Sequence, residues 1–141
     1  MSGGQIVLNP FVPQRERIVM RANIIDSERR FQVWKYTVGH RQLLLRSTKS
    51  LTSPTRIDVF FKGVVQFHLP TSLAGLSIAE VDASDINECR NLPELGIKKE
   101  TNVYKVTTKS FVGYVVSLTA AFHEDEGEYD DPSFFAKENI L

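Results

Sequence analysis

Short runs of β-branched and aromatic residues recur along this chain, and no long helical pattern lies between them. Residues 56–62 show the pattern most clearly, because Ile57, Val59 and Phe61 alternate with mostly polar side chains, as in a half-buried strand. Segments of this kind predict about seven to nine strands. They favour a mainly β fold, an antiparallel β-sandwich or a partly open barrel, over a βαβ architecture.

Turn residues and glycines set the expected strand boundaries. Asp26-Ser27-Glu28 separates residues 18–25 from residues 31–38, which predicts a β-hairpin. Gly63 predicts a bend or bulge in the sheet. The run from Phe111 to Phe122 is the most apolar of the chain and predicts a central strand. One short helix is expected near residues 84–92, with Ser84 as its N-cap.

The length and composition predict one β-rich domain over residues 1–141. Hydrophobic residues make up 42% of the chain and charged residues 24%, which excludes wholesale disorder. Residues 1–16, which contain two prolines and a pair of glycines, are expected to be an irregular lead-in. Residues 132–141 are expected either to fray or to form one helical turn.

The charges are balanced overall but unevenly distributed. Residues 1–70 contain eleven Lys and Arg against four Asp and Glu, whereas residues 71–141 contain six against thirteen. A net charge of zero does not indicate a globally basic nucleic-acid-binding protein. The uneven distribution is first of all solvated surface charge. It also allows attraction between the halves, within one sheet or between copies in a homo-oligomer.

Cys89 is the single cysteine, so the chain has no internal disulfide, which fits a reducing compartment. The N-terminus lacks a signal-peptide pattern, and no apolar run approaches the roughly 18 residues needed to cross a membrane. We therefore expect a cytoplasmic protein without membrane contact. The polar surroundings of Cys89 favour an inert thiol over a nucleophile.

No catalytic, cofactor or metal motif is present, so we assign no catalytic, cofactor-binding or metal-binding residue. The histidines, His40, His68 and His123, do not have the spacing of a zinc site. The serines lie outside nucleophile motifs, and the glycines form no phosphate-binding loop. The sequence leans away from an enzyme, but it leaves open a site assembled from distant strands.

The strongest candidate for partner binding is an acidic stretch near the C-terminus. Its six carboxylates are Glu124, Asp125, Glu126, Glu128, Asp130 and Asp131. A solvated acidic loop is the simplest interpretation. Binding of a basic partner protein is the second, and adventitious divalent-cation binding is the third.

The basic N-terminal half offers an alternative site for nucleic acid or a small ligand. Cationic and aromatic residues lie close together there, namely Arg29, Arg30, Lys35, Arg41, Arg46 and Lys49 with Phe31, Trp34 and Tyr36. Exposed aromatic rings flanked by cations can stack on bases. Phe31 and Trp34 face opposite sides of a strand, however, which favours core packing over a stacking platform.

Leu43-Leu44-Leu45, residues 56–64, Leu69 and Leu76-Ser77-Ile78 form an apolar strand, an alternating strand, a Gly-Val step and a leucine-rich hairpin. This pattern, over about a quarter of the chain, resembles small uncharacterised bacterial β-rich proteins. Some of these are considered immunity proteins of polymorphic toxin systems. The resemblance implies a β-sandwich that binds a protein and blocks its active site. The acidic stretch would then be the contact surface.

Together these features predict a non-catalytic protein-binding module, either an inhibitor or an immunity-type protein. Its protein partner is unidentified, and no cofactor is expected. Nucleic-acid or small-ligand binding through the basic N-terminal half is the alternative.

Overall fold

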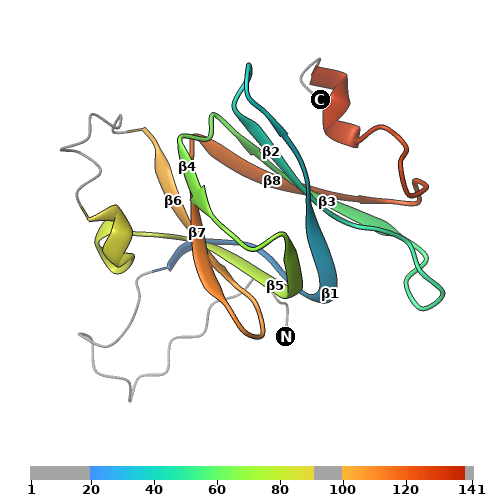
Figure 1. Cartoon of the computed structure of the whole chain (residues 1–141), viewed down its shortest axis with the longest axis horizontal. Coiled ribbons are helices and arrows are strands. Elements are labelled where there is room, and N and C mark those ends of the chain that lie inside the picture. Colours follow the sequence, from blue (N-terminus) through green and yellow to red (C-terminus); the bar gives the residue numbers. More distant parts are fainter. Residues whose placement is uncertain (1–19, 91–99, 139–141) are drawn as a thin grey trace.

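The computed structural model describes residues 20–90 and 100–138, which form one antiparallel sheet with three short helical turns (Figure 1). The strands are β1 (Met20–Thr37), β2 (Gln42–Ser47), β3 (Arg56–Lys62), β4 (Gln66–His68), β5 (Ser72–Val81), β6 (Asn102–Thr107), β7 (Val112–Ser117) and β8 (Thr119–Asp125). The 3₁₀ turns are η2 (Ala83–Asp85), η3 (Asn87–Cys89) and η5 (Phe134–Glu138). The mainly β prediction is confirmed, with eight strands. The predicted lead-in at residues 1–16 lies outside the described residues.

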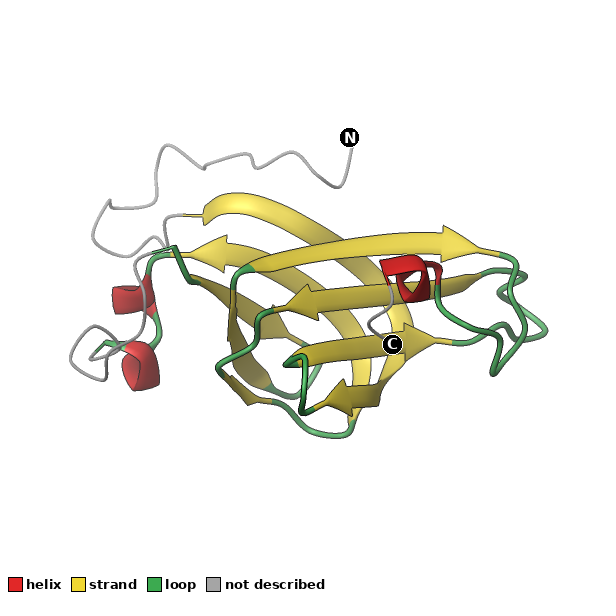
Figure 2. Cartoon of the chain, turned by 90° about the horizontal axis from the view of Figure 1, so that it is seen from above, coloured by secondary structure: helices red, strands yellow, loops and turns green. Residues whose placement is uncertain are grey.

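The sheet curves into a barrel because strands at one end of the sheet continue along the chain into strands at its other end. Its order is β4-β7-β6-β5-β1-β2-β3-β8, and β3 runs directly into β4 while β7 runs into β8. Two hydrogen bonds link the β3–β8 ladder to the β4–β7 ladder, from Leu118 N–H to the Lys62 carbonyl (3.0 Å) and from Val65 N–H to the Val116 carbonyl (2.9 Å). The result is a partly open barrel whose curved wall is visible in Figure 2.

The paired segments β3–β4 and β7–β8 form the seam that closes the barrel. Gly63 and Gly113 allow these two segments to bend and to approach each other. Gly63 has φ +70°, a left-handed conformation that glycine adopts at little cost, and the predicted bend at this residue is confirmed. Gly113 in β7 lies so close to β4 that a Cβ atom there would overlap the carbonyl oxygen of His68. The apolar run from Phe111 to Phe122 therefore forms part of the seam, as β7 and β8.

The predicted hairpin around Asp26-Ser27-Glu28 is wrong, because residues 20–37 form one continuous strand. The register against β5 shifts between Ser27 and Arg30, so the turn-like residues form a bulge instead of a reversal. The Ser27 hydroxyl accepts a hydrogen bond from the backbone N–H of Arg29 (3.1 Å) within this bulge. The bent strand then pairs with β5 along its first part and with β2 along its last part.

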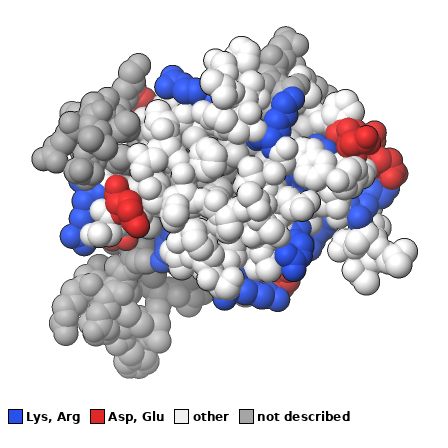
Figure 3. Space-filling view, viewed as in Figure 1, with Lys and Arg blue, Asp and Glu red and all other residues white. Residues whose placement is uncertain are grey.

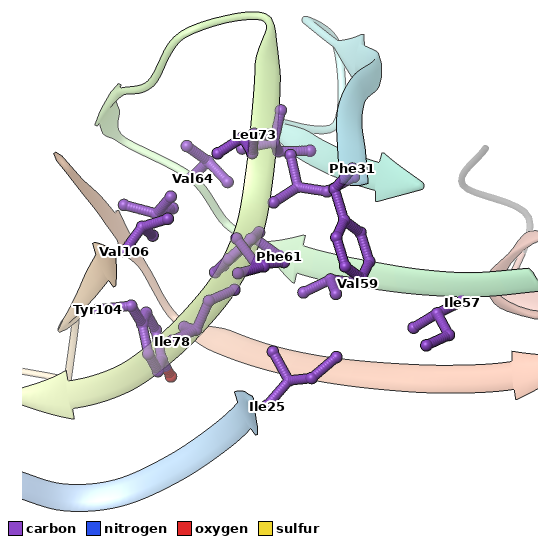
Figure 4. Packing of buried hydrophobic residues seen from close by; sticks show 14 residues of the cluster. Ile25, Phe31, Ile57, Val59, Phe61, Val64, Leu73, Ile78, Tyr104 and Val106 are labelled. Carbon is purple, nitrogen blue, oxygen red and sulfur yellow. The ribbon is translucent and has the colours of Figure 1, made fainter. Parts of the chain in front are cut away.

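The barrel interior is filled by inward-facing side chains from most of the strands (Figure 4). The inward face of β3 predicted from the sequence, Ile57, Val59 and Phe61, belongs to this core. Phe31 is fully buried there, as core packing predicted. Burial of side chains of this size contributes roughly 1.5–3 kcal/mol each to folding, so the interior is the main source of stability.

Two smaller apolar clusters lie on the outside of the sheet. One packs Val81, Val103 and Val116 against Ile86 and Cys89 of the η2–η3 segment. The predicted helix near residues 84–92 takes the form of these two 3₁₀ turns, and its last two residues lie outside the described part. The second cluster stacks Phe60 of β3 on Phe135 of η5.

The cap of η2 and the C-terminal tail are both defined in the structure. The carboxylate of Asp82, and not the side chain of Ser84, caps η2, by accepting a hydrogen bond from the Ser84 backbone N–H (3.1 Å). The C-terminal tail forms the short turn η5, which lies against the outer face of the sheet (Figure 2). None of the described helical turns has the length and apolar character that crossing a membrane requires.

We expect Gly113→Ala to lower the free energy of unfolding by about 1–3 kcal/mol, because the added methyl group forces β7 away from the His68 carbonyl. Gly39→Ala is the matched control, since nothing lies within 4 Å of a Cβ atom at Gly39. Urea denaturation of both variants provides the comparison. Equal stabilities for the two would contradict a close approach of β4 and β7.

Cys89 is fully buried, and burial together with nearby Glu88 raises the pKa of its thiol to about 11. Because the thiolate is the reactive form, we expect Cys89 in the folded protein at pH 8 to react with a disulfide reagent on the order of a hundredfold more slowly than in denaturant. Stopped-flow absorbance measures both rates. Comparable rates would mean that the η2–η3 segment does not cover the thiol.

Candidate functional site

The barrel is open between the first part of β1 and β8. Within the described residues, β1 pairs with β2 only from Gln32 onward, and β8 pairs only with β3. Each strand therefore presents one edge without a hydrogen-bonded neighbour in this part of the chain. Between the edges lies a cavity of about 430 Å³, which we call the β1–β8 groove. It is lined by Asn23, Ile24, Ile25, Asp26, Ser27, Ile57, Phe122 and Glu124.

The floor of the β1–β8 groove is apolar and continuous with the barrel core. Ile25 and Ile57 belong to the interior cluster, and Ile24 packs against it. Phe122 lies opposite Val59 in the β3–β8 ladder, so its side chain is on the inward face of the sheet. It nevertheless remains 48% exposed, because none of the described strands pairs with β8 on this side. The groove therefore offers an accessible aromatic ring beside a preformed apolar surface.

The rim of the β1–β8 groove carries two acidic side chains, Asp26 and Glu124. Asp26 is exposed on β1. The Glu124 carboxylate accepts a hydrogen bond from the Thr55 hydroxyl (2.6 Å) and lies 3.8 Å from the Arg29 guanidinium. An acidic rim around an apolar floor favours a ligand that combines apolar groups with positive charge.

Arg29 bridges one end of the opening. Its guanidinium donates to the hydroxyls of Ser47 (3.2 Å) and Thr55 (2.9 Å) and to the Thr55 carbonyl. These contacts tie the bulge of β1 to both ends of the loop that joins β2 to β3. The bridge holds the first part of β1 at a fixed place beside the β2–β3 loop, where regular strand pairing has ended.

The acidic stretch begins within β8, and its remainder lies in a C-terminal strap, residues 125–136, that folds back over the outer face of the sheet. The Arg56 guanidinium, whose side chain is 2% exposed, forms a two-pronged ion pair with Asp125 at 3.1 Å on each branch. It also donates to the backbone carbonyls of Glu128, Asp131 and Pro132 (2.7–3.2 Å). One buried arginine thus fixes both sides of the loop in the strap.

Arg46 is the second anchor of the C-terminal strap. Its guanidinium pairs with the Asp58 carboxylate through two hydrogen bonds (2.7 and 3.0 Å), with both side chains 2% exposed, and donates to the Tyr129 carbonyl (3.1 Å). It also lies 5.1 Å from the centre of the Trp34 ring, whose edge contacts the Tyr129 ring. The strap is therefore held by buried charged groups and by aromatic contacts.

Most of the predicted partner-binding acids have contacts within the chain. Asp125 binds Arg56, Glu128 binds Lys49 (2.8 Å), and Asp131 accepts from the Glu128 N–H (2.9 Å). Glu124 lies on the rim of the groove, while Glu126 and Asp130 are exposed. Figure 3 shows acidic side chains beside lysine and arginine at the right edge of this face, with further acidic side chains at its left edge. Binding of a partner through this stretch stays a prediction.

The basic and aromatic residues of the alternative site do not form one platform. Phe31 lies in the core, Trp34 lies next to the C-terminal strap, and Tyr36 contacts Phe67. The histidines lie apart, on a turn (His40), on β4 (His68) and on β8 (His123), where the His123 ring stacks on Phe134. No group of three His, Cys, Asp or Glu residues in residues 20–90 and 100–138 is placed to hold a metal ion.

Three comparisons with known proteins gave no match, since no family model, no curated protein and no solved structure is similar to this chain. The candidate site therefore follows from its own residues. The β1–β8 groove could not be predicted from the sequence, because Phe122 ends the most apolar run of the chain and its pattern indicates a core strand. The only available signal was the acidic residues that follow it.

We expect Asp125→Asn to lower the unfolding midpoint at neutral pH. Burial opposes ionisation of Asp125, but hydrogen bonds from Arg56 and from the Gly127 N–H outweigh it and lower the pKa of the carboxyl. A lowered pKa means that the ion pair stabilises the fold above the usual Asp pKa and is lost as the pH falls through the lower, folded-state value. The difference between wild type and variant should therefore shrink below about pH 4.

Denaturation curves between about pH 2 and pH 7 test this expectation. Asp130→Asn serves as control, because Asp130 is exposed and its removal breaks no contact to Arg56. A pH-independent difference between wild type and Asp125→Asn would show that the Arg56 pair does not control strap docking.

Proposed function

We propose that this chain is a non-catalytic protein-binding module that takes an extended segment of a partner protein in the β1–β8 groove. The observation that carries the proposal is a pair of strand edges, unpaired within residues 20–90 and 100–138, that flank an apolar floor with an exposed phenylalanine. A free edge is a ready template for a further strand, which obtains affinity from backbone hydrogen bonds and specificity from alternate side chains.

Phe122 is the expected anchor for the bound segment. An exposed aromatic residue next to a preformed apolar cavity is a typical centre of a binding surface, because its burial removes a large apolar area from water. Ile24 and Ile25 on the opposite strand complete the apolar contact. A cavity of about 430 Å³ has room for a few side chains of the bound segment and not for a folded domain.

The expected partner segment carries a basic residue beside its apolar ones. Asp26 and Glu124 line the groove, and complementary charge across an interface favours correct encounter. Glu126 and Asp130, with their exposed carboxylates, extend the same preference onto the C-terminal strap. The inhibitor or immunity role implied by the family resemblance would follow if the bound segment belonged to the active site of a toxin or another enzyme.

We expect Phe122→Ser to weaken peptide binding at least tenfold while leaving the fold intact, since the ring is half exposed. The probe is a displayed library of random peptides, from which the tightest binders are synthesised and titrated by NMR. Val38→Ser is the matched control, an exposed apolar residue in the turn between β1 and β2. Selected peptides should alternate apolar residues and contain Lys or Arg.

The location of the chemical-shift changes decides the outcome. Changes confined to Asn23–Ser27 and Phe122–Glu124, and lost in Phe122→Ser, would support the proposal. Peptides that bind both variants equally, or that shift residues elsewhere, would overturn it. Capture of a cellular protein by wild type but not by Phe122→Ser would then identify the natural partner.

A further inference from the structure

A second cavity, of about 450 Å³, lies on the other side of Arg29 from the β1–β8 groove. It is formed by the bulge of β1, the end of β2 and the β2–β3 loop, and we call it the hydroxyl cavity. Its lining residues are all polar or charged, although their carbon atoms form the larger share of the cavity surface; they are Glu28, Arg29, Arg30, Gln32, Arg46, Ser47, Thr48, Ser50, Thr52 and Ser53. Half of these residues carry a hydroxyl group, and three carry a guanidinium.

The hydroxyl groups come from one short segment of loop. Ser50 and Ser53 form an isolated β-bridge (backbone N–O distances 2.9 and 3.2 Å), which closes the loop into a tight turn. The Ser50 hydroxyl also accepts a hydrogen bond from the Thr52 N–H (3.3 Å). The turn holds several hydroxyl groups around one space. Hydroxyl and guanidinium donors converging on one point are the groups that bind phosphate oxygens in proteins.

The Arg29 guanidinium differs from those of the buried Arg46 and Arg56 in its hydrogen-bond partners. Arg46 and Arg56 each form a two-pronged pair with an aspartate within hydrogen-bond distance. The Arg29 side chain is 20% exposed, yet its hydrogen-bond partners are neutral oxygens of Ser47 and Thr55. Its nearest carboxylate, on Glu124, lies 3.8 Å away. Arg29 is therefore paired with Glu124 at a longer distance than Arg46 and Arg56 are paired with their aspartates, and no carboxylate of the described residues accepts a hydrogen bond from it.

Arg30 adds a second cation at the mouth of the hydroxyl cavity. It is exposed, and its guanidinium donates a hydrogen bond to the neutral hydroxyl of Ser72 (2.9 Å). The single acidic residue of the lining, Glu28, is 92% exposed and lies 3.9 Å from Lys109. The cavity thus combines Arg29, whose carboxylate partner Glu124 lies 3.8 Å away, and the exposed Arg30 with one acid that points to solvent.

We propose that the hydroxyl cavity binds the phosphate group of a small phosphate monoester. Arg29 and Arg30 supply the charge, and the hydroxyls of Ser47, Thr48 and Ser53 supply further donors to the phosphate oxygens. The volume exceeds what one phosphate ion needs, which leaves room for the esterified part of the molecule. This site is separate from the β1–β8 groove and does not depend on peptide binding there.

The probes are inorganic phosphate, glycerol 3-phosphate and glycerol, titrated at constant ionic strength and followed by NMR of the backbone amides. Both phosphate compounds should shift the amides of residues 47–53, whereas glycerol should not. Tighter binding of glycerol 3-phosphate than of inorganic phosphate would support the monoester as the ligand, and equal affinities would overturn it in favour of the free ion. An absence of shifts in this segment would overturn the proposal.

Variants distinguish phosphate binding inside the hydroxyl cavity from general attraction of anions to positive charge on the surface. We expect Arg30→Gln to weaken phosphate binding about tenfold, as loss of a charge-assisted hydrogen bond does. Lys62→Gln, which removes an exposed cation outside the cavity, should leave binding unchanged, and Glu28→Gln should strengthen it. Equal weakening by Arg30→Gln and Lys62→Gln would overturn the proposal. So would binding of a single-stranded oligonucleotide with the same shifts in the absence of monoester binding.

Discussion

The pairing of residues 56–68 with residues 112–125 is the constraint on which the other strands depend. It joins the two ends of the sheet, and it requires both segments to bend at the same place, beside Gly63 and Leu118. Once this seam is closed, the remaining strands have to span the distance around it. The long β1 does so through its register shifts, since each bulge adds twist that a regular strand lacks. The barrel stays open at β8 because the first part of β1 bends away from β8 and does not pair with it.

Buried charge has a different role on the outer face of the same sheet. Arg46 and Arg56 lie on neighbouring strands, and together they hold backbone carbonyls of a segment that follows β8. A buried ion pair adds little net stability when both partners are desolvated, but an unpaired one is costly. The arrangement therefore specifies where the C-terminal strap docks more than it strengthens the fold. In the strap, the Lys49–Glu128 and Arg56–Asp125 pairs each join a basic residue of the first half of the sequence to an acidic residue of the second half.

The alternation of Ile57, Val59 and Phe61 was enough to predict an inward face, because side-chain period follows directly from strand geometry. The residues at 26–28 were misleading, since the same types form turns and bulges, and only the partner strand decides between them. The acidic stretch was visible in the sequence, but its arginine partner Arg56 is 69 residues from Asp125, a pairing that composition does not reveal. The β1–β8 groove was invisible for a related reason. An edge is defined by a neighbour that is missing from the sheet, and no local pattern of residues encodes it.

An edge that accepts a foreign strand is also open to a second copy of the same chain, and this is how many β-proteins aggregate. Two features of the β1–β8 groove work against that outcome. The bulges of β1 disturb the even spacing that a straight strand would need, and Asp26 and Glu124 place negative charge beside both open edges. Like charges facing each other across paired strands are destabilising. The acidic rim thus disfavours pairing of this edge with a second copy, and it would favour a strand that carries positive charge.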